Sequence, residues 1–391
     1  MARLHLSLLL VVLTLGACAP EVPREPAAET TAATRFSFDW AAGREIHEPR
    51  LIAEPDGSLL MVWREKAADG SNIYVARGLD DGTFSEPVRV NDQPDTVESY
   101  PHDEMRAAVA TGSGARLAVG WSDSRGQVRA AESSDGGQTF APSLRLEQVE
   151  AASYRGFPDL AYGEDGALHA VWIDSRFAEG MAEEPADLFY ARVVDGVVTE
   201  LNLTAEQEPT ICGCCRPNLE IVHGRPRALF RNSTSDGYRD IFTIAGDLET
   251  GFEAPTRVGA PLWKLRGCPM AGPMAADDLV IWPDGSTGRK LLMSSPFDDQ
   301  PPVPLFAETE GETWTPRLSP RRVASGPHVP QRLLLPGQSA SRLLSPGDNA
   351  GGWVVELADL PAWASSAYVT GNSLVLVGAV EGELMHEYRQ L

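Results

Sequence analysis

The chain contains Leu59-Leu60-Met61-Val62-Trp63-Arg64-Glu65 and repeats this pattern as Leu117-Ala118-Val119-Gly120-Trp121-Ser122-Asp123 and Leu168-His169-Ala170-Val171-Trp172-Ile173-Asp174. Each copy is an apolar run that ends in an aromatic residue next to polar ones. Weaker copies follow at Ala228-Leu229-Phe230-Arg231-Asn232 and Leu279-Val280-Ile281-Trp282. The aromatic residues stand at positions 63, 121, 172, 230 and 282, so they are 51 to 58 residues apart. A fixed period of this length indicates a repeat of supersecondary units.

Each repeat unit has the pattern of four short antiparallel strands. In the first unit a strand over 49–52 and a Pro-Asp-Gly turn at 55–57 precede the apolar run, and a third strand over 72–77 follows it. Small sheets of this kind bury their faces by packing radially around an axis. We therefore expect an all-β fold, a single β-propeller domain over residues 35–391. We count six blades, because residues 283–391 finish the fifth unit and supply about one more, and seven blades are also compatible.

The composition agrees with a turn-rich globular protein. The 391 residues include 36 glycines and 30 prolines, which favours short elements joined by turns. The formal net charge of −22 argues against a partner among nucleic acids. We expect a monomer.

The amino terminus has the pattern of an export signal. Arg3 is followed by an apolar run over 6–15 that is too short to span a bilayer, and then by Leu15-Gly16-Ala17-Cys18. This motif resembles the lipobox of bacterial lipoproteins, which implies cleavage after residue 17 and a lipid on Cys18; the alternative is an ordinary secretory signal. Residues 18–34 are expected to be the lipidated cysteine and a flexible tether. Because Ala19 is not aspartate, the resemblance implies the outer membrane, with the lipid anchor as the only membrane contact.

One turn has a specific signature, Ser133-Ser134-Asp135-Gly136-Gly137-Gln138-Thr139-Phe140. It is similar to the Asp box, Ser-x-Asp-x-Gly-x-Thr-aromatic. The serine and aspartate are expected to bond the turn backbone, and the glycines tolerate positive φ. We interpret this motif as structural.

With this motif and the four-strand unit, residues 45–391 resemble the sialidase-like propellers, also called BNR or Asp-box repeat proteins. The stretch from Arg50 to Leu60 is similar to the segment that opens sialidases, although Pro49 precedes the arginine instead of following it. The resemblance implies that Arg50 binds a substrate carboxylate, that Asp69 is the acid/base and that Tyr368 is the nucleophile. No glutamate partner for the tyrosine is identifiable, so the sequence leaves hydrolysis open.

Arginines stand in or just before the predicted first strand of five blades. First strands line the channel of a propeller, so these residues converge on one face. Guanidinium groups bind carboxylates and phosphates bidentately, which predicts an anion site; the alternative is ion pairing between blades. The five are Arg50, Arg106, Arg155, Arg216 and Arg332.

The four cysteines beyond Cys18 precede two successive first strands. Thiolate, thioether and imidazole ligands suit copper(I), and cysteine with histidine also suits zinc. In an exported chain the same cysteines are expected to form two disulfides, or one disulfide and a thiol pair. The candidate metal ligands are Cys212, Cys214, Cys215, Cys268, Met270 and His102.

Two functions from different classes follow. The first is an envelope protein that recognises an acidic sugar or a related small anion, and either binds or hydrolyses it. The second is a non-enzymatic envelope protein that binds copper or zinc at the channel mouth. A scaffold for protein partners is a third reading, with no residue that marks it.

Overall fold

In the computed structural model, the contacts between residues group Ala33 to Leu391 together. The described residues are 36–54, 56–98, 106–149, 153–178, 186–205, 210–259, 263–265, 267, 269–276, 279–286, 291–296, 301–305, 320–325, 331–347, 353–370 and 372–391. The predicted leader and tether, with Cys18, lie outside these residues. In the described part, no helix is long and apolar enough to cross a membrane.

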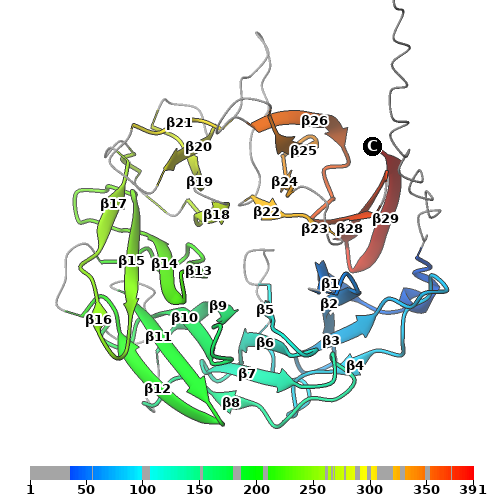
Figure 1. The fold of residues 1–391 in the computed structure, drawn as a ribbon, viewed down its shortest axis with the longest axis horizontal. Coiled ribbons are helices and arrows are strands. Elements are labelled where there is room, and N and C mark those ends of the chain that lie inside the picture. Colours follow the sequence, from blue (N-terminus) through cyan, green and yellow to red (C-terminus); the bar gives the residue numbers. More distant parts are fainter. Residues whose placement is uncertain are drawn as a thin grey trace, which may run out of the picture. The chain divides into compact units, whose positions relative to one another are not determined.

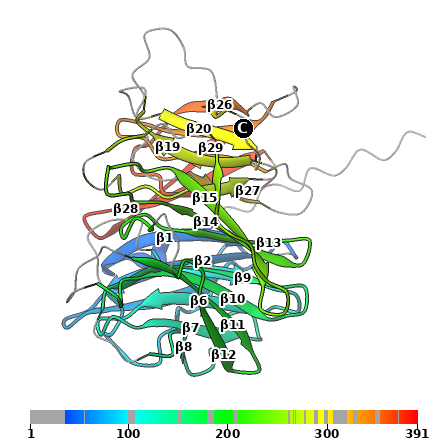
Figure 2. The same ribbon diagram turned by 90° about the vertical axis from the view of Figure 1, so that its left-hand side faces the viewer.

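The described residues form seven sheets that follow one another around a ring, as Figure 1 shows. The first strands of the blades lie nearest the centre of the ring, and Figure 2 shows the strands of blade 3 side by side in chain order. In the described part of the chain, one short 3-10 helix, η1 (Asp39–Ala41), precedes the first strand. The predicted all-β propeller is confirmed, with seven blades, the higher of the two expected counts.

The first three blades are four-stranded antiparallel sheets in which the chain runs outward from the centre. Their strands are β1 (Ile46–Ala53), β2 (Leu59–Lys66), β3 (Ser71–Arg77) and β4 (Val88–Arg89); β5 (Ala108–Thr111), β6 (Leu117–Ser122), β7 (Val128–Ser133) and β8 (Leu144–Arg145); and β9 (Arg155–Tyr162), β10 (Leu168–Asp174), β11 (Asp187–Val194) and β12 (Val197–Asn202).

Blades 4 and 5 keep this plan, and blade 4 has an additional short strand on its outer side. Their strands are β13 (Asn218–Val222), β14 (Arg225–Arg231), β15 (Ile241–Asp247), β16 (Gly251–Phe252) and β17 (Thr256–Val258); and β18 (Met274–Ala276), β19 (Leu279–Asp284), β20 (Leu291–Pro296) and β21 (Val303–Pro304).

Blades 6 and 7 share one segment near the centre. Its first part pairs antiparallel with blade 6 and its second part pairs parallel with blade 7, so residues 321–325 join two sheets. The strands are β22 (Arg321–Arg322), β24 (Leu333–Leu335), β25 (Ser341–Pro346) and β26 (Trp353–Leu360); and β23 (Ala324–Ser325), β27 (Ser366–Thr370), β28 (Ser373–Val380) and β29 (Glu383–Gln390).

The repeated aromatic residue packs between the second and third strands of a blade. Trp63 stacks on Tyr74 and Trp172 stacks on Phe189, each with 5.8 Å between ring centroids. The indole N–H of Trp172 donates to the carboxylate of Asp174 at 3.4 Å. The indoles of Trp63 and Trp282 make the same bond, so in these blades the acidic residue two positions later satisfies a buried donor.

The Asp-box-like turn is bonded as its sequence predicts. Asp135 accepts hydrogen bonds from the Thr139 backbone N–H at 2.9 Å and from the Thr139 hydroxyl at 2.6 Å, and Ser133 Oγ accepts from the Gly137 N–H at 2.8 Å. The two bonds from Thr139, together with one from the Ser133 hydroxyl, lower the pKa of Asp135 to about 2. The motif closes a turn on the outer side of blade 2 and does not line the cavity described below.

The ring closes between blades 7 and 1. The Tyr388 hydroxyl donates to the Phe36 carbonyl at 2.7 Å and accepts from the Phe36 N–H at 2.6 Å. Nearer the centre, the Leu51 N–H donates to the Ser366 hydroxyl at 2.9 Å. Blade 1 and blade 7 are each built from their own end of the chain, so hydrogen bonds and side-chain packing hold the junction.

Candidate functional site

A cavity of about 390 Å³ opens among the first strands of the blades. Its described polar lining comes from six of the seven blades, and this size is in the range of small-molecule sites. The cavity therefore joins residues from most of the ring. The charged and polar lining residues are Arg50, Arg106, Asp159, Arg216, Asn218, Arg321, Arg322, Ser325, Gln331, Ser365 and Ser366.

Arg50 reaches the cavity through an irregular strand. The β1–β2 register shifts between His47 and Arg50, and Glu48 has a φ of 53°, an unusual conformation for a residue other than glycine. The Arg50 guanidinium then donates from Nη1 to the Ala107 carbonyl of the next blade at 2.8 Å. The bulge thus directs the side chain along the inner edge of the ring.

Arg216 follows the cysteine turn and precedes β13. Its Nη1 donates to the Arg106 carbonyl at 2.8 Å, and its Nη2 donates to Asp159 Oδ1 at 3.2 Å. These two bonds place the Arg216 guanidinium beside the segment that holds Arg106. Blades 2, 3 and 4 therefore meet at this side of the cavity.

Arg321 and Arg322 lie on the segment shared by blades 6 and 7. Arg321 donates to the Ser365 carbonyl, and Arg322 donates from Nη2 to the Ala275 carbonyl at 2.9 Å. Both guanidinium groups are thus oriented by backbone acceptors on neighbouring blades. A carbonyl fixes the direction of a guanidinium group without neutralising its charge.

The cavity is strongly positive although the whole chain is acidic. Its described lining has five arginines and one acidic residue, Asp159. Burial lowers the pKa of Arg50 well below its ordinary value, repulsion by Arg106, Arg216 and Arg321 lowers it further, and Asp159 opposes this shift. The guanidinium groups are thus close enough to repel one another, and an anion bound among them would relieve that repulsion.

Asp159 also holds neighbouring strands together. Its Oδ2 accepts from the Asn218 side chain at 3.0 Å and from the Leu219 N–H at 2.9 Å, while Oδ1 accepts from Arg216. Both carboxylate oxygens are therefore engaged in joining β9 to β13. We regard Asp159 as a positioning residue.

The cavity contains three of the five predicted arginines, Arg50, Arg106 and Arg216. Arg155, which we expected at the site, is instead 2 % exposed and donates from Nε to Asp174 Oδ2 at 2.8 Å within blade 3. Arg332 donates to the Glu356 carboxylate at 2.7 Å and is not a lining residue. For these two residues, ion pairing is the observed arrangement, because a carboxylate lies within reach of each guanidinium.

The two predicted catalytic residues also lie elsewhere. Asp69 is exposed in the turn between β2 and β3. Tyr368 is 7 % exposed on β27 and packs in the core cluster that contains Phe38 and Trp63. Neither residue lines the cavity. Ser366, two residues earlier on the same strand, does line the cavity, and Tyr368 lies about 7 Å farther along the strand.

Sequence reasoning missed Arg321, Arg322 and Gln331. The predicted sixth first strand was placed near His328, which lies outside the described residues, as do Cys268 and His102. The Arg321-Arg322 pair just after Pro320 is the available signal, since two adjacent arginines beside a short apolar stretch are unusual in an acidic chain.

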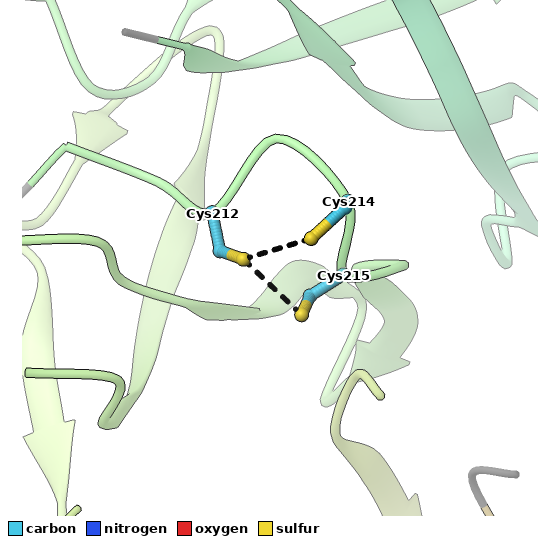
Figure 3. A group of neighbouring side chains, drawn as sticks. All are labelled: Cys212, Cys214 and Cys215. Carbon is cyan, nitrogen blue, oxygen red and sulfur yellow. Dashed lines mark hydrogen bonds between the residues drawn. The ribbon is translucent and has the colours of Figure 1, made fainter. Parts of the chain in front are cut away.

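A second candidate site is the turn at residues 212–215, drawn in Figure 3. Cys212 and Cys215 are thiols, and Cys214 is disulfide-bonded. The Cys212 sulfur lies 3.2 Å from the Cys215 sulfur and 3.4 Å from the Cys214 sulfur. All three side chains are buried, and Met270 packs against them.

The three sulfur atoms lie within 4.8 Å of one another, so this cluster could hold a metal ion. Three thiolates beside a thioether are a soft donor set. A disulfide sulfur is not a thiolate, and Cys214 would therefore have to be reduced to serve as a ligand.

Fold and cavity together define a seven-bladed β-propeller with a cationic central site. No protein-family model matches the chain, and no curated protein matches it. Among solved structures it is similar to a puromycin hydrolase, with 17 % identity and a TM-score of 0.54 over 89 % of this chain and 53 % of that one. This chain thus spans about half the length of the hydrolase.

Two further neighbours are glycoside hydrolases. A Hadza microbial sialidase has 13 % identity and a TM-score of 0.48, over 86 % of this chain and 77 % of that one. An α-L-arabinofuranosidase from Fusarium graminearum has 12 % identity and a TM-score of 0.47, over 89 % of this chain and 93 % of that one. At these identities the neighbours inform the fold alone.

Proposed function

We propose that the protein binds an acidic sugar or a related small anion in the arginine-lined cavity. The observation that carries this proposal is the group of five guanidinium side chains around one cavity, with a single acidic residue among the described lining. Four of these side chains donate to backbone carbonyls, which orients them before any ligand arrives: Arg50, Arg216, Arg321 and Arg322. Preorganised charged donors are suited to carboxylate or phosphate.

Binding is favoured over hydrolysis. The resemblance to sialidases assigned the chemistry to Asp69 and Tyr368, and neither is a lining residue. Within the described lining, the single carboxylate, Asp159, is engaged by two strands and by Arg216. A glycosidase needs an acid and a nucleophile or base at the reacting bond. We therefore propose a binding protein with a sialidase-like fold.

Calorimetry tests this proposal with the purified full-length protein. N-acetylneuraminic acid and glucuronic acid should bind, while the uncharged N-acetylglucosamine should not. Arg216→Gln should weaken binding at least tenfold, and Arg332→Gln, which removes an arginine outside the lining, should leave it unchanged. Equal binding of the charged and neutral sugars would contradict the proposal, and turnover of a fluorogenic sialoside would contradict the choice of binding over hydrolysis.

We further propose that the protein is exported and lipid-anchored in a bacterial envelope. This rests on Arg3, the apolar run over 6–15 and the Leu-Gly-Ala-Cys motif that ends at Cys18. Metabolic labelling with palmitate should mark the wild-type protein and not Cys18→Ala. Recovery of the unmodified wild-type protein from the soluble fraction would contradict the proposal.

The sulfur cluster supports a second candidate function, binding of a soft metal ion by the fully reduced turn. Under anaerobic conditions with reductant, we expect the protein to retain about one copper(I) after dialysis. A variant with Cys212, Cys214 and Cys215 all changed to serine should retain none. Loss of copper and zinc from the reduced wild-type protein would remove this candidate and leave the anion site unaffected.

A further inference from the structure

The cysteine turn brings two thiols and one disulfide sulfur together in a buried place. Cys212 is central, with its sulfur 3.4 Å from the disulfide sulfur of Cys214 and 3.2 Å from the thiol of Cys215 (Figure 3). Cys212 and Cys215 are 1 % and 2 % exposed. They are also separated by two residues, so the sequence Cys212-Gly213-Cys214-Cys215 contains a Cys-x-x-Cys dithiol in addition to the bridged cysteine.

We propose that this turn is a thiol–disulfide exchange site with two arrangements. The Cys212 thiolate attacks the Cys214 sulfur, forms a Cys212–Cys214 bond and releases the cysteine formerly bonded to Cys214 as a thiolate. The Cys215 thiolate then attacks Cys212, which forms a Cys212–Cys215 disulfide and releases Cys214. One disulfide and two thiols are present before and after, so the electrons balance without an external oxidant, and the protons pass to the released sulfurs.

Contact distances favour exchange within the turn. The attacking thiol must reach a disulfide sulfur, and both sulfur pairs are already in van der Waals contact. The backbone closes the turn as well, because the Cys215 N–H donates to the Cys212 carbonyl at 3.4 Å. Burial protects the thiols from large partners, whereas an internal reaction needs no access from outside.

The exchange site adjoins the arginine cavity through the chain itself. Arg216 directly follows Cys215, and Pro217 and Asn218 are lining residues. The Arg216 carbonyl is held closely by the blade 5 segment, since a β-carbon on Gly272 would lie 1.8 Å from it. When the disulfide moves from one pair of cysteines to another, the turn at residues 212–215 must change its conformation next to the Arg216 carbonyl. The affinity for an anion therefore depends on the disulfide arrangement, an effect that rests on the proposed function.

Differential alkylation and peptide mapping test the exchange without any ligand. The full-length protein is equilibrated in glutathione buffers from reducing to oxidising, the thiols are blocked, and the disulfides are identified by mass spectrometry. We expect wild-type protein to contain both the original Cys214 disulfide and the Cys212–Cys215 disulfide at intermediate potentials. Cys215→Ser should contain the original Cys214 disulfide and the Cys212–Cys214 bond, because it lacks the thiol that completes the exchange. A single arrangement at every potential, with Cys212 and Cys215 always alkylated, would overturn the proposal.

The coupling has its own readout, the affinity for inorganic phosphate. Cys214→Ser, oxidised so that Cys212 and Cys215 pair, should differ at least threefold in phosphate affinity from Cys215→Ser. Equal affinities would overturn the coupling, and no binding to any form would overturn it together with the anion site. The mapping of wild-type protein uses no substitution, so it still decides the exchange if a variant fails to fold.

Discussion

Arg50 and Arg155 lie on the first strands of blades 1 and 3, yet their surroundings are opposite. The cross-strand neighbour of Arg155 is Asp174, and the two form a buried ion pair. The cross-strand neighbour of Arg50 is Val62, so its guanidinium extends to a carbonyl of the next blade. Arg321 and Arg322 resemble Arg50, because they lie opposite Leu334 and Leu333. The residue opposite an arginine on the second strand therefore decides whether the charge is neutralised or remains in the cavity.

The largest effect should be the loss of stability when the buried ion pair between Arg155 and Asp174 is broken. Asp174 is fully buried and accepts from both Arg155 and Arg176. Asp174→Asn leaves the buried Arg155 guanidinium without its carboxylate, while Arg176 keeps its bond to Glu200. The loss should lower the free energy of unfolding by about 3–5 kcal/mol. Urea denaturation measures this change. The exposed pair Asp165–Arg192 provides the control, since Asp165→Asn should cost less than about 1 kcal/mol. Equal losses in the two variants would contradict the comparison.

Substitution of a cavity arginine should change the affinity for an anion and leave the free energy of unfolding nearly unchanged. Burial, and then repulsion by neighbouring arginines, disfavour the charged form of Arg50, so we expect Arg50→Gln to remove a charge that does not stabilise the fold. We expect the unfolding free energy to change by less than about 1 kcal/mol, while anion affinity falls by about 1.5–3 kcal/mol, the usual contribution of a charged hydrogen bond. Calorimetry and urea denaturation of the same preparation separate the two quantities. If Arg50→Gln unfolds easily and binds the anion normally, Arg50 stabilises the fold and does not bind the ligand.

Salt should have a smaller effect, and it should change the affinity of the cavity for an anion more than it changes the stability of the protein. Screening weakens attraction between an incoming anion and exposed or partly exposed guanidinium groups more than it weakens a buried pair. Raising sodium chloride from about 50 to 500 mM should reduce the affinity for glucuronic acid by roughly three- to tenfold. Unfolding of the wild-type protein, measured at the same salt concentrations, should shift little. Salt-independent binding would show that charge does not drive recognition.

The smallest expected effect concerns Glu98. As with Arg50, burial and a neighbouring like charge disfavour its charged form. Burial, with repulsion by Asp123, raises the pKa of Glu98 from 4.5 to about 7. The folded state therefore holds a proton that the unfolded state releases between these values, and stability falls as the pH rises from 4.5 to 7. Glu98→Gln should flatten this fall and stabilise the protein by roughly 1 kcal/mol at pH 8, a figure reduced for solvent screening. Urea midpoints from pH 5 to 8 measure it, and an unchanged pH slope would contradict the cause given.

Much of the fold could be predicted because Trp63, Trp121 and Trp172 recur, each with an acidic residue two positions later. A seventh blade was harder to recognise because the second strand of blade 6, β24, reads only Leu333-Leu334-Leu335 and lacks the aromatic residue. Residues 321–325 add to the difficulty, since a single short segment supplies strands to two sheets. Pairing of this kind leaves no periodic pattern in the sequence.

The site was predictable only as far as position in the repeat determines it. Arg50, Arg106 and Arg216, chosen by their position in the repeat, are lining residues of the cavity. Position could not exclude Arg155 and Arg332, because that requires knowing that Asp174 and Glu356 lie within reach of them. The cysteines could be grouped by sequence, and the expectation of one disulfide with a thiol pair matches Cys214 and the Cys212–Cys215 thiols. The distances between their sulfurs depend on the turn.

The contact between Tyr388 and Phe36 joins residues 352 positions apart in the chain. Because a chain is synthesised from its amino terminus, Phe36 and β1 are present long before β29 exists. Contacts over such separations are also slow to form. The cavity lining also spans the junction between blades 7 and 1. There the Leu51 N–H donates to the Ser366 hydroxyl, and Leu51 is next to Arg50 in the chain. The five cavity arginines consequently come together only at the last stage of folding, so a chain truncated before blade 7 should not form the anion site that we propose.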